Sequence, residues 1–184
     1  MRKLALISVL MCVASLSFGE IRASDRTDGA YKRKTVHLTS QSIVVNGVSA
    51  FSNGWGSVKV FDWREGVVRL HGAVADLTFT AATNLIYTNA GLDIAVGSAA
   101  VSDDNLTGAT DANMVSAIAI DPRNSDTNHL SGFMQTLGQT NFNGTATALD
   151  AYVNMNVDSN DISAVVTGTI SGTITFTYSN LGDY

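Results

Sequence analysis

The chain has 184 residues, of which 45% are hydrophobic and 15% charged, with one Pro, one Cys and a formal net charge of −5 at pH 7. This length fits one domain with an N-terminal appendage, and the lone Cys12 excludes an intrachain disulfide framework and a cysteine-rich metal site. Charged residues are well below the roughly 25% of ordinary soluble domains, which argues against a nucleic-acid-binding body and favours a sheet-rich, neutral polar surface.

The first 19 residues have the pattern of a secretory signal. Arg2 and Lys3 precede a mostly apolar run over residues 4–16, and Gly19 is a small residue suited to cleavage. As a helix this run spans about 20 Å, too short for a bilayer core of about 30 Å. We expect a cleaved leader and no membrane span after its removal. The alternatives are a hydrophobic helix that docks on a partner and a start codon assigned too far upstream.

Residues 20–34 are polar, charged and without a hydrophobic period, which predicts a flexible basic arm. Residues 1–34 hold seven Lys or Arg against three acidic residues, whereas from His71 onward Arg123 is the only cation beside eleven Asp. An acidic body repels phosphates, so a polyanion would have to contact the arm. Its triplet Lys32, Arg33 and Lys34 is also typical of a plain solvated charge run.

Beyond Thr35 the hydrophobic pattern has a period of two, which predicts β-strands. The expected strands cover residues 36–38, 42–45, 57–63, 66–80, 92–101, 145–157 and 164–178. Within 66–80 the pattern changes phase, and we expect a β-bulge or a bend around Ala75 and Asp76, where the strand passes a corner between two sheets. Residues 145–157 predict a half-buried strand, with Asp150, Asn154 and Asn156 alternating with apolar residues. The odd positions 167–177 form a row of Thr and Ser, which suits a face that is solvated or lies against another subunit.

Helix is scarce in this sequence. Residues 110–119 could form one or two helical turns behind an N-cap at Thr110, and Pro122 would end them. Residues 123–143 predict a long loop. We therefore expect an all-β chain with at most one short helix, folded as a single β-sandwich over residues 35–184, of which a jelly roll is one candidate form.

Catalytic and metal sites find little support in the sequence. The three histidines lie in separate segments, and the chain has no G-x-S-x-G elbow, P-loop or G-x-G-x-x-G motif. We expect a protein that is not an enzyme and has no cofactor and no metal. Three clusters of Asp and Asn, at residues 103–105, 124–128 and 158–161, could bind Ca²⁺, but turns use the same residues. The aromatic group Phe51, Trp55, Phe61 and Trp63 could be a sugar-stacking platform, although core packing is favoured.

The C-terminal part carries a family resemblance. Residues 144–158, G-T-A-T-A-L-D-A-Y-V-N-M-N-V-D, are followed by G-T-I-S-G-T-I-T-F-T-Y-S-N-L-G-D-Y at 168–184. Together with residues 65–80, these stretches resemble a group of tailed-bacteriophage virion structural proteins. The resemblance implies a small β-sandwich that is capsid-associated, decoration-type or otherwise accessory, with no catalytic residues to carry over. The signal-like leader departs from it, because phage head proteins assemble in the cytoplasm.

Two hypotheses follow. The first is a virion structural protein that binds other virion proteins or copies of itself as a homo-oligomer. We expect its main body to contact no nucleic acid. Its expected contact residues are Thr169, Thr173, Thr175, Thr177, Asn180, Leu181, Asp183 and Tyr184. The second is a β-sandwich that is secreted or periplasmic through its leader and binds a glycan or a cell-surface partner.

Overall fold

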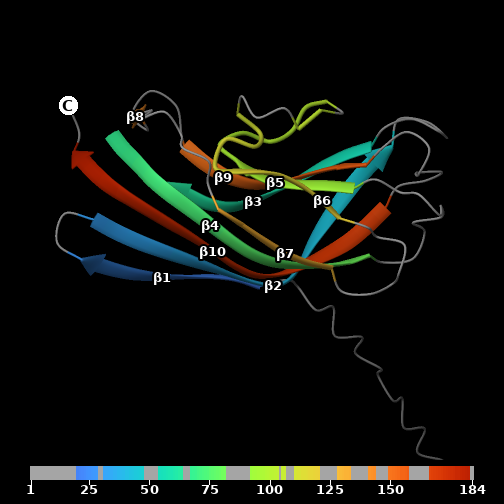
Figure 1. Cartoon of the computed structure of the whole chain (residues 1–184), viewed down its shortest axis with the longest axis horizontal. Coiled ribbons are helices and arrows are strands. Elements are labelled where there is room, and N and C mark those ends of the chain that lie inside the picture. Colours follow the sequence, from blue (N-terminus) through green and yellow to red (C-terminus); the bar gives the residue numbers. More distant parts are fainter. Residues whose placement is uncertain are drawn as a thin grey trace, which may run out of the picture.

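A computed structural model describes residues 20–28, 31–47, 54–63, 67–81, 92–103, 105–106, 110–120, 128–133, 141–143, 149–157 and 166–182. The described residues form ten β-strands (Figure 1). In chain order they are β1 (Glu20–Asp28), β2 (Tyr31–Gly47), β3 (Gly54–Trp63), β4 (Val67–Ala81), β5 (Leu92–Gly97), β6 (Val115–Ile120), β7 (Asn128–Phe133), β8 (Asn141–Asn143), β9 (Leu149–Val157) and β10 (Val166–Gly182).

The strands make two antiparallel sheets that pack face to face, which confirms the expected all-β sandwich (Figure 1). Sheet A has the order β1-β2-β10-β4, and β7 and β8 pair with different parts of β4. Sheet B has the order β6-β5-β9-β3, and the end of β2 pairs with β3 through Asn46 and Gly47. This arrangement is the double Greek-key order of a jelly roll, in which the strands β2-β10-β4-β7 face the strands β3-β9-β5-β6. Strand β1 adds an outer strand to the first of these sheets.

The core lies between the inward faces of the two sheets. On β10 the alternation predicted from the sequence is confirmed, because Ile170, Ile174 and Phe176 are fully buried and the threonines between them are half-buried. Val153 and Met155 of β9 are fully buried on the opposing sheet. Each such side chain contributes about 1.5–3 kcal/mol relative to an exposed position. The core therefore holds the two sheets together and fixes which face of each strand points outward.

The irregularity in β4 lies at His71, so the predicted bulge at Ala75 and Asp76 is wrong. The register with β10 shifts between Leu70 and Gly72, which leaves His71 as the extra residue. After this point the odd positions turn inward, and Ala75 is buried while Asp76 is exposed. The sequence does not show that the phase changes at His71, because the neighbouring Gly72 has no side chain and fits either face of a strand.

The basic arm is not irregular in the structure. Residues 20–28 form β1 and residues 31–34 begin β2, so the prediction of a flexible segment is wrong for them. Strand β1 pairs with β2 along its whole length, from Glu20 opposite Thr39 to Asp28 opposite Tyr31. An outer strand needs a backbone partner more than it needs an apolar face, which is why its sequence lacks the period of two.

Two further segments differ from the prediction. Residues 110–114 are bends and residues 115–120 form β6, where a short helix was expected. Val115 is buried and lies opposite Val96 of β5, so pairing between strands decides the conformation over local propensity. The stretch 123–143, expected as a loop, contains β7 and β8.

Candidate functional site

The outward side of sheet A carries the threonines that the sequence singled out. We call this surface the threonine face and define it by Tyr31 and Thr35 of β2, Val74 of β4, and Thr173, Thr175 and Thr177 of β10. Thr175 lies directly between Thr35 and Val74 in the sheet. The Oγ1 atoms of Thr35 and Thr175 are 3.1 Å apart and share a hydrogen bond. Short hydroxyl side chains thus form the central row of this face, with Arg33 of β2 opposite Thr177 and Asp76 of β4 opposite Thr173.

Two larger side chains stand out from the threonine face. Tyr31 is 53% exposed and Val74 is 54% exposed. The Tyr31 ring packs edge-on against the imidazole of His71, with ring centroids 4.9 Å apart. The His71 Nε2 lies 2.8 Å from the Ser179 Oγ within a hydrogen bond. These contacts hold the Tyr31 ring in place beside the threonine rows.

The structure places the other predicted contact residues as follows. Thr169 is half-buried on β10, on the far side of the bulge that follows Ile170. Asn180 and Leu181 are exposed near the end of β10. Asp183 and Tyr184 lie outside the described residues. Sequence reasoning missed Tyr31 and Val74, because only the pairing of β2 and β4 with β10 brings them beside the threonines.

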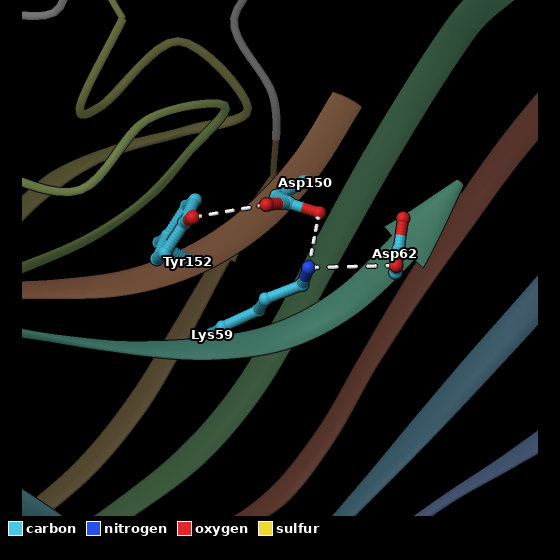
Figure 2. A network of polar contacts seen from close by, with 4 residues as sticks. All are labelled: Lys59, Asp62, Asp150 and Tyr152. Carbon is cyan, nitrogen blue, oxygen red and sulfur yellow. Dashed lines mark hydrogen bonds and ion pairs between the residues drawn. The ribbon is translucent and has the colours of Figure 1, made fainter. Parts of the chain in front are cut away.

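The outward side of sheet B carries a network of charged and polar groups (Figure 2). The Lys59 Nζ lies 2.6 Å from the Asp150 Oδ1 and 3.4 Å from the Asp62 Oδ2. The Tyr152 hydroxyl donates a hydrogen bond to the Asp150 Oδ2 at 3.0 Å. Asp150 therefore uses both carboxylate oxygens, and the network ties β3 to β9. Asp150 and Tyr152 stand two residues apart on one strand, and this spacing in the sequence predicts that they share a face. The sequence does not show that Lys59 of β3 lies opposite them.

The protonation behaviour of this network speaks against a catalytic role. The hydrogen bond to Asp150 is the main reason that the pKa of Lys59 is raised above its ordinary 10.5. Burial, followed by the hydrogen bond to Asp150, raises the pKa of Tyr152 above its ordinary 10.0. At neutral pH Lys59 thus stays an ammonium ion and Tyr152 a neutral phenol, whereas a base or nucleophile needs a lowered pKa in these groups. The network acts as a clamp between two strands.

A covering segment, made of residues 98–103, 105–106 and 110–114, lies over sheet B (Figure 1). Asn154 of β9 holds it, with its Nδ2 donating to the carbonyls of Ala99 at 2.9 Å and Asp111 at 2.7 Å. Its Oδ1 accepts from the Val101 amide at 3.1 Å, and Ser57 Oγ accepts from the same amide at 2.9 Å. Asn154 is fully buried, so the expectation of an open polar side on this strand is wrong at its position.

A groove of about 680 Å³ lies at one end of the sandwich. It is lined by residues of five strands: Ile21 and Ala23 of β1, Lys32 and Lys34 of β2, Val60, Phe61, Asp62 and Trp63 of β3, Val68 of β4, and Tyr178 and Asn180 of β10. Sequence reasoning missed this site, because it placed Lys32 and Lys34 in a solvated arm.

The aromatic group near the start of the domain packs mainly inward. Trp63 is only 4% exposed and makes edge-on contacts with Phe61 and Phe176, at centroid distances of 4.8 and 4.9 Å. Core packing is therefore the role of Trp63. Trp55 is half-buried, and Phe51 lies outside the described residues.

The candidate calcium clusters gain no support where the structure describes them. The Asp103 Oδ1 accepts a hydrogen bond from the Asn105 amide at 3.0 Å, which is an ordinary Asx turn. Residues 124–127 and 158–161 lie outside the described ranges. Within those ranges no three His, Cys, Asp or Glu side chains are grouped so as to hold a metal ion. The same part of the chain contains no helix with the length and apolarity needed to cross a membrane.

No family model matches the chain, and no curated protein matches it.

Proposed function

We propose that this chain is a non-enzymatic structural protein of a tailed-bacteriophage particle. It acts as a capsid-associated or decoration-type component that binds the particle, or copies of itself, through the threonine face. The observation that carries this proposal is a broad sheet surface with a central row of threonines, on which Tyr31 and Val74 are each more than half exposed.

The size of sheet A suits such a role. Over the nine residue pairs of β1 and β2, four strands present roughly 600 Å² in projection, from the usual strand spacing and rise. Each partner in a standard protein interface contributes roughly 800 Å² of accessible surface. Tyrosine is enriched at interfaces, and threonines held in a sheet lose little side-chain freedom on binding. The outward side of these four strands, with the threonine face at its centre, therefore provides most of the area that a specific interface needs.

The fold narrows the function without deciding it. Jelly rolls occur in viral capsid proteins and in lectins, and one fold hosts many functions. The likeness of the C-terminal stretches to phage virion proteins favours the first of these uses. Localisation in the virion is part of the same proposal.

The test uses particles of the phage that encodes the chain. Val74→Glu places a charge in the middle of the threonine face, and Ala117→Glu on β6 is the matched control at an exposed position of sheet B. We expect Val74→Glu to weaken both particle binding and self-association at least tenfold, because an interface must desolvate the new carboxylate. Co-sedimentation with particles and sedimentation equilibrium measure the two effects.

Circular dichroism should show that both variants fold like the parent protein. Equal binding by Val74→Glu and Ala117→Glu would exclude the threonine face as the contact surface. Mass spectrometry of purified particles that finds the major head proteins but not this chain would refute the virion role itself.

The second candidate is a secreted β-sandwich that binds a glycan or a cell-surface partner. The signal-like leader and the groove with two lysines favour it. Detection of the protein outside the cytoplasm with residues 1–19 removed would support this alternative, whereas an intact N-terminus on assembled particles would refute it.

A further inference from the structure

We propose that two copies of the chain associate edge to edge through β1, as an antiparallel pair about a twofold axis at Ala23, so that their A sheets form one continuous sheet. This contact uses the edge of sheet A and not the threonine face. It goes beyond the proposed structural function and does not rest on it.

The outer edge of sheet A is a long strand with one open side. Strand β1 pairs with β2 through nine consecutive residue pairs without a shift of register, and Figure 1 shows it along the rim of the sheet. Among the described strands β2 is its only partner. In an antiparallel sheet, alternate residues direct their backbone N–H and C=O groups to opposite neighbours. About half of the backbone groups of β1 therefore face away from β2, where another strand can pair with them.

The charges of β1 decide which pairing is possible. Proteins protect open sheet edges with prolines, β-bulges or charged side chains. Strand β1 has no proline and no shift of register with β2, but it does carry charges. Its five charged residues are Glu20, Arg22, Asp25, Arg26 and Asp28. Depending on the register, these charges repel or attract a second copy of the strand.

A twofold axis restricts the register further. Directly opposite residues of an antiparallel pair lie on the same side of the sheet, so the axis passes through a residue that faces its own copy. With the axis at Ala23, Glu20 lies opposite Arg26 of the second copy, and symmetry repeats this pair. Arg22 then lies opposite the neutral Ser24. No two like charges are directly opposite in this register.

The neighbouring registers bring like charges together. With the axis at Ser24, Arg22 lies opposite Arg26 of the second copy. With the axis at Asp25, that residue faces its own copy, and the same holds for an axis at Arg22. Like charges directly opposite each other destabilise a sheet. The charges therefore favour the axis at Ala23.

Exposed apolar side chains at the same place support this axis independently. Ile21 and Ala23 lie opposite the buried residues Leu38 and Val36 and thus on the inward side of sheet A, yet both are exposed. In the proposed pair, Ala23 faces its own copy and Ile21 lies diagonal to Ala23 of the second copy. Four apolar side chains therefore meet at the axis and are removed from water together.

The axis is perpendicular to the sheet, so the outward sides of both copies lie on one side of the dimer. The two threonine faces can then contact one support together, which strengthens the attachment of both. Only residues 20–26 of each chain pair at the edge, which makes this contact smaller than one through the threonine face. It is therefore the weaker contact, and it accounts for the self-association that remains in Val74→Glu.

The test is disulfide cross-linking of the full chain in a Cys12→Ser background, in which an introduced cysteine is the only thiol. Directly opposite residues have Cα atoms about 4.5–5.5 Å apart, which a disulfide can span. Ala23→Cys should therefore form a covalent dimer under mild oxidation. Thr27→Cys is the matched control on the same side of β1. Its two copies would be about 27 Å apart, so it should cross-link at least tenfold more slowly.

Exchange of charges tests the register. Arg26→Glu should slow cross-linking through Ala23→Cys at least tenfold, because two carboxylates then lie opposite each other. Addition of Glu20→Arg should restore the rate to within threefold of the parent. Arg22→Glu is the matched control with the same change of charge; it lies opposite Ser24 and should also stay within threefold. Circular dichroism should show that each variant folds like the parent.

The outcomes separate the edge from the register and from the threonine face. Equal rates for Ala23→Cys and Thr27→Cys, or no cross-linking of either, would overturn the edge contact. A rate that Arg26→Glu leaves unchanged, or that the exchange does not restore, would refute the axis at Ala23. Val74→Glu should weaken particle binding but keep the cross-linking rate of Ala23→Cys within twofold. Loss of cross-linking in Val74→Glu would instead assign the contact to the threonine face.

Discussion

Removal of the Asn154 side chain should detach the covering segment from sheet B. Asn154 is fully buried and makes three hydrogen bonds to backbone groups of that segment. In Asn154→Ala the carbonyls of Ala99 and Asp111 lose this donor. The Val101 amide keeps an acceptor, because the Ser57 Oγ lies 2.9 Å away.

The expected cost follows from these bonds. Two lost hydrogen bonds to carbonyls, at about 0.5–1.5 kcal/mol each, and a small cavity give about 2–4 kcal/mol. Ser57→Ala alone should cost about 1 kcal/mol, because Asn154 still accepts from the Val101 amide. The double variant leaves that amide without either acceptor. It should therefore lose about 1–2 kcal/mol more than the sum of the single variants.

Urea unfolding followed by circular dichroism measures the free energy of unfolding of all four proteins, and hydrogen exchange at Val101 reports the local opening. The Val101 amide should exchange fastest in the double variant. A loss of under 0.5 kcal/mol in Asn154→Ala, together with additive effects of the two changes, would show that the segment is not held by this side chain.

Five other substitutions, at four positions, test different parts of the structure. Gly97→Ala should cost at least about 2 kcal/mol in thermal unfolding, because its Cβ would overlap the backbone of residues 110 and 111; Gly72→Ala, with open space around it, should stay within about 0.5 kcal/mol. Ser40→Gly should raise the melting temperature by a few degrees, because Ser40 has a φ of 47°, whereas Ser40→Val should lower it. The pKa values of Lys59 and Tyr152, which both contact Asp150, are raised, so the folded state holds these two protons more tightly than the unfolded state does. Their stabilisation is full below about pH 10 and is lost as pH rises through the folded pKa values, so Asp150→Asn should flatten this fall in unfolding free energy between pH 9 and 11.5.

The sandwich and most of its inner strands could be predicted from the sequence, because one face of each is buried. On β10, for example, the apolar residues Ile170, Ile174 and Phe176 all stand at even positions, and all three are fully buried. Strand β1 could not be predicted in this way, since it lies at an edge and its side chains alternate without an apolar face. The sequence records burial, whereas β1 forms through backbone pairing.

The sites were harder to predict than the fold. Asn154 has the polarity of a solvated strand residue, and its burial depends on a segment more than 40 residues earlier in the chain that folds back over β9. The groove likewise joins Lys32 and Lys34 to Phe61 through the packing of two sheets. These contacts cannot be predicted from the hydrophobic period of a strand or from the spacing of residues in a motif. The row of threonines on β10 could be predicted from the sequence. Their neighbours Tyr31 and Val74 could not, because only the register of β2 and β4 with β10 places them there.

The covering segment gives the molecule two unlike sides. On sheet B, Ala99, Val101 and Asp111 lie over β9, so part of that broad surface is already occupied by the chain itself. On sheet A the threonine face has no such cover among the described residues. Copies that bind a support through sheet A alone would orient alike, with sheet B turned away from the contact. Such a polarity favours a layer one molecule thick on a support and works against stacking into a three-dimensional aggregate.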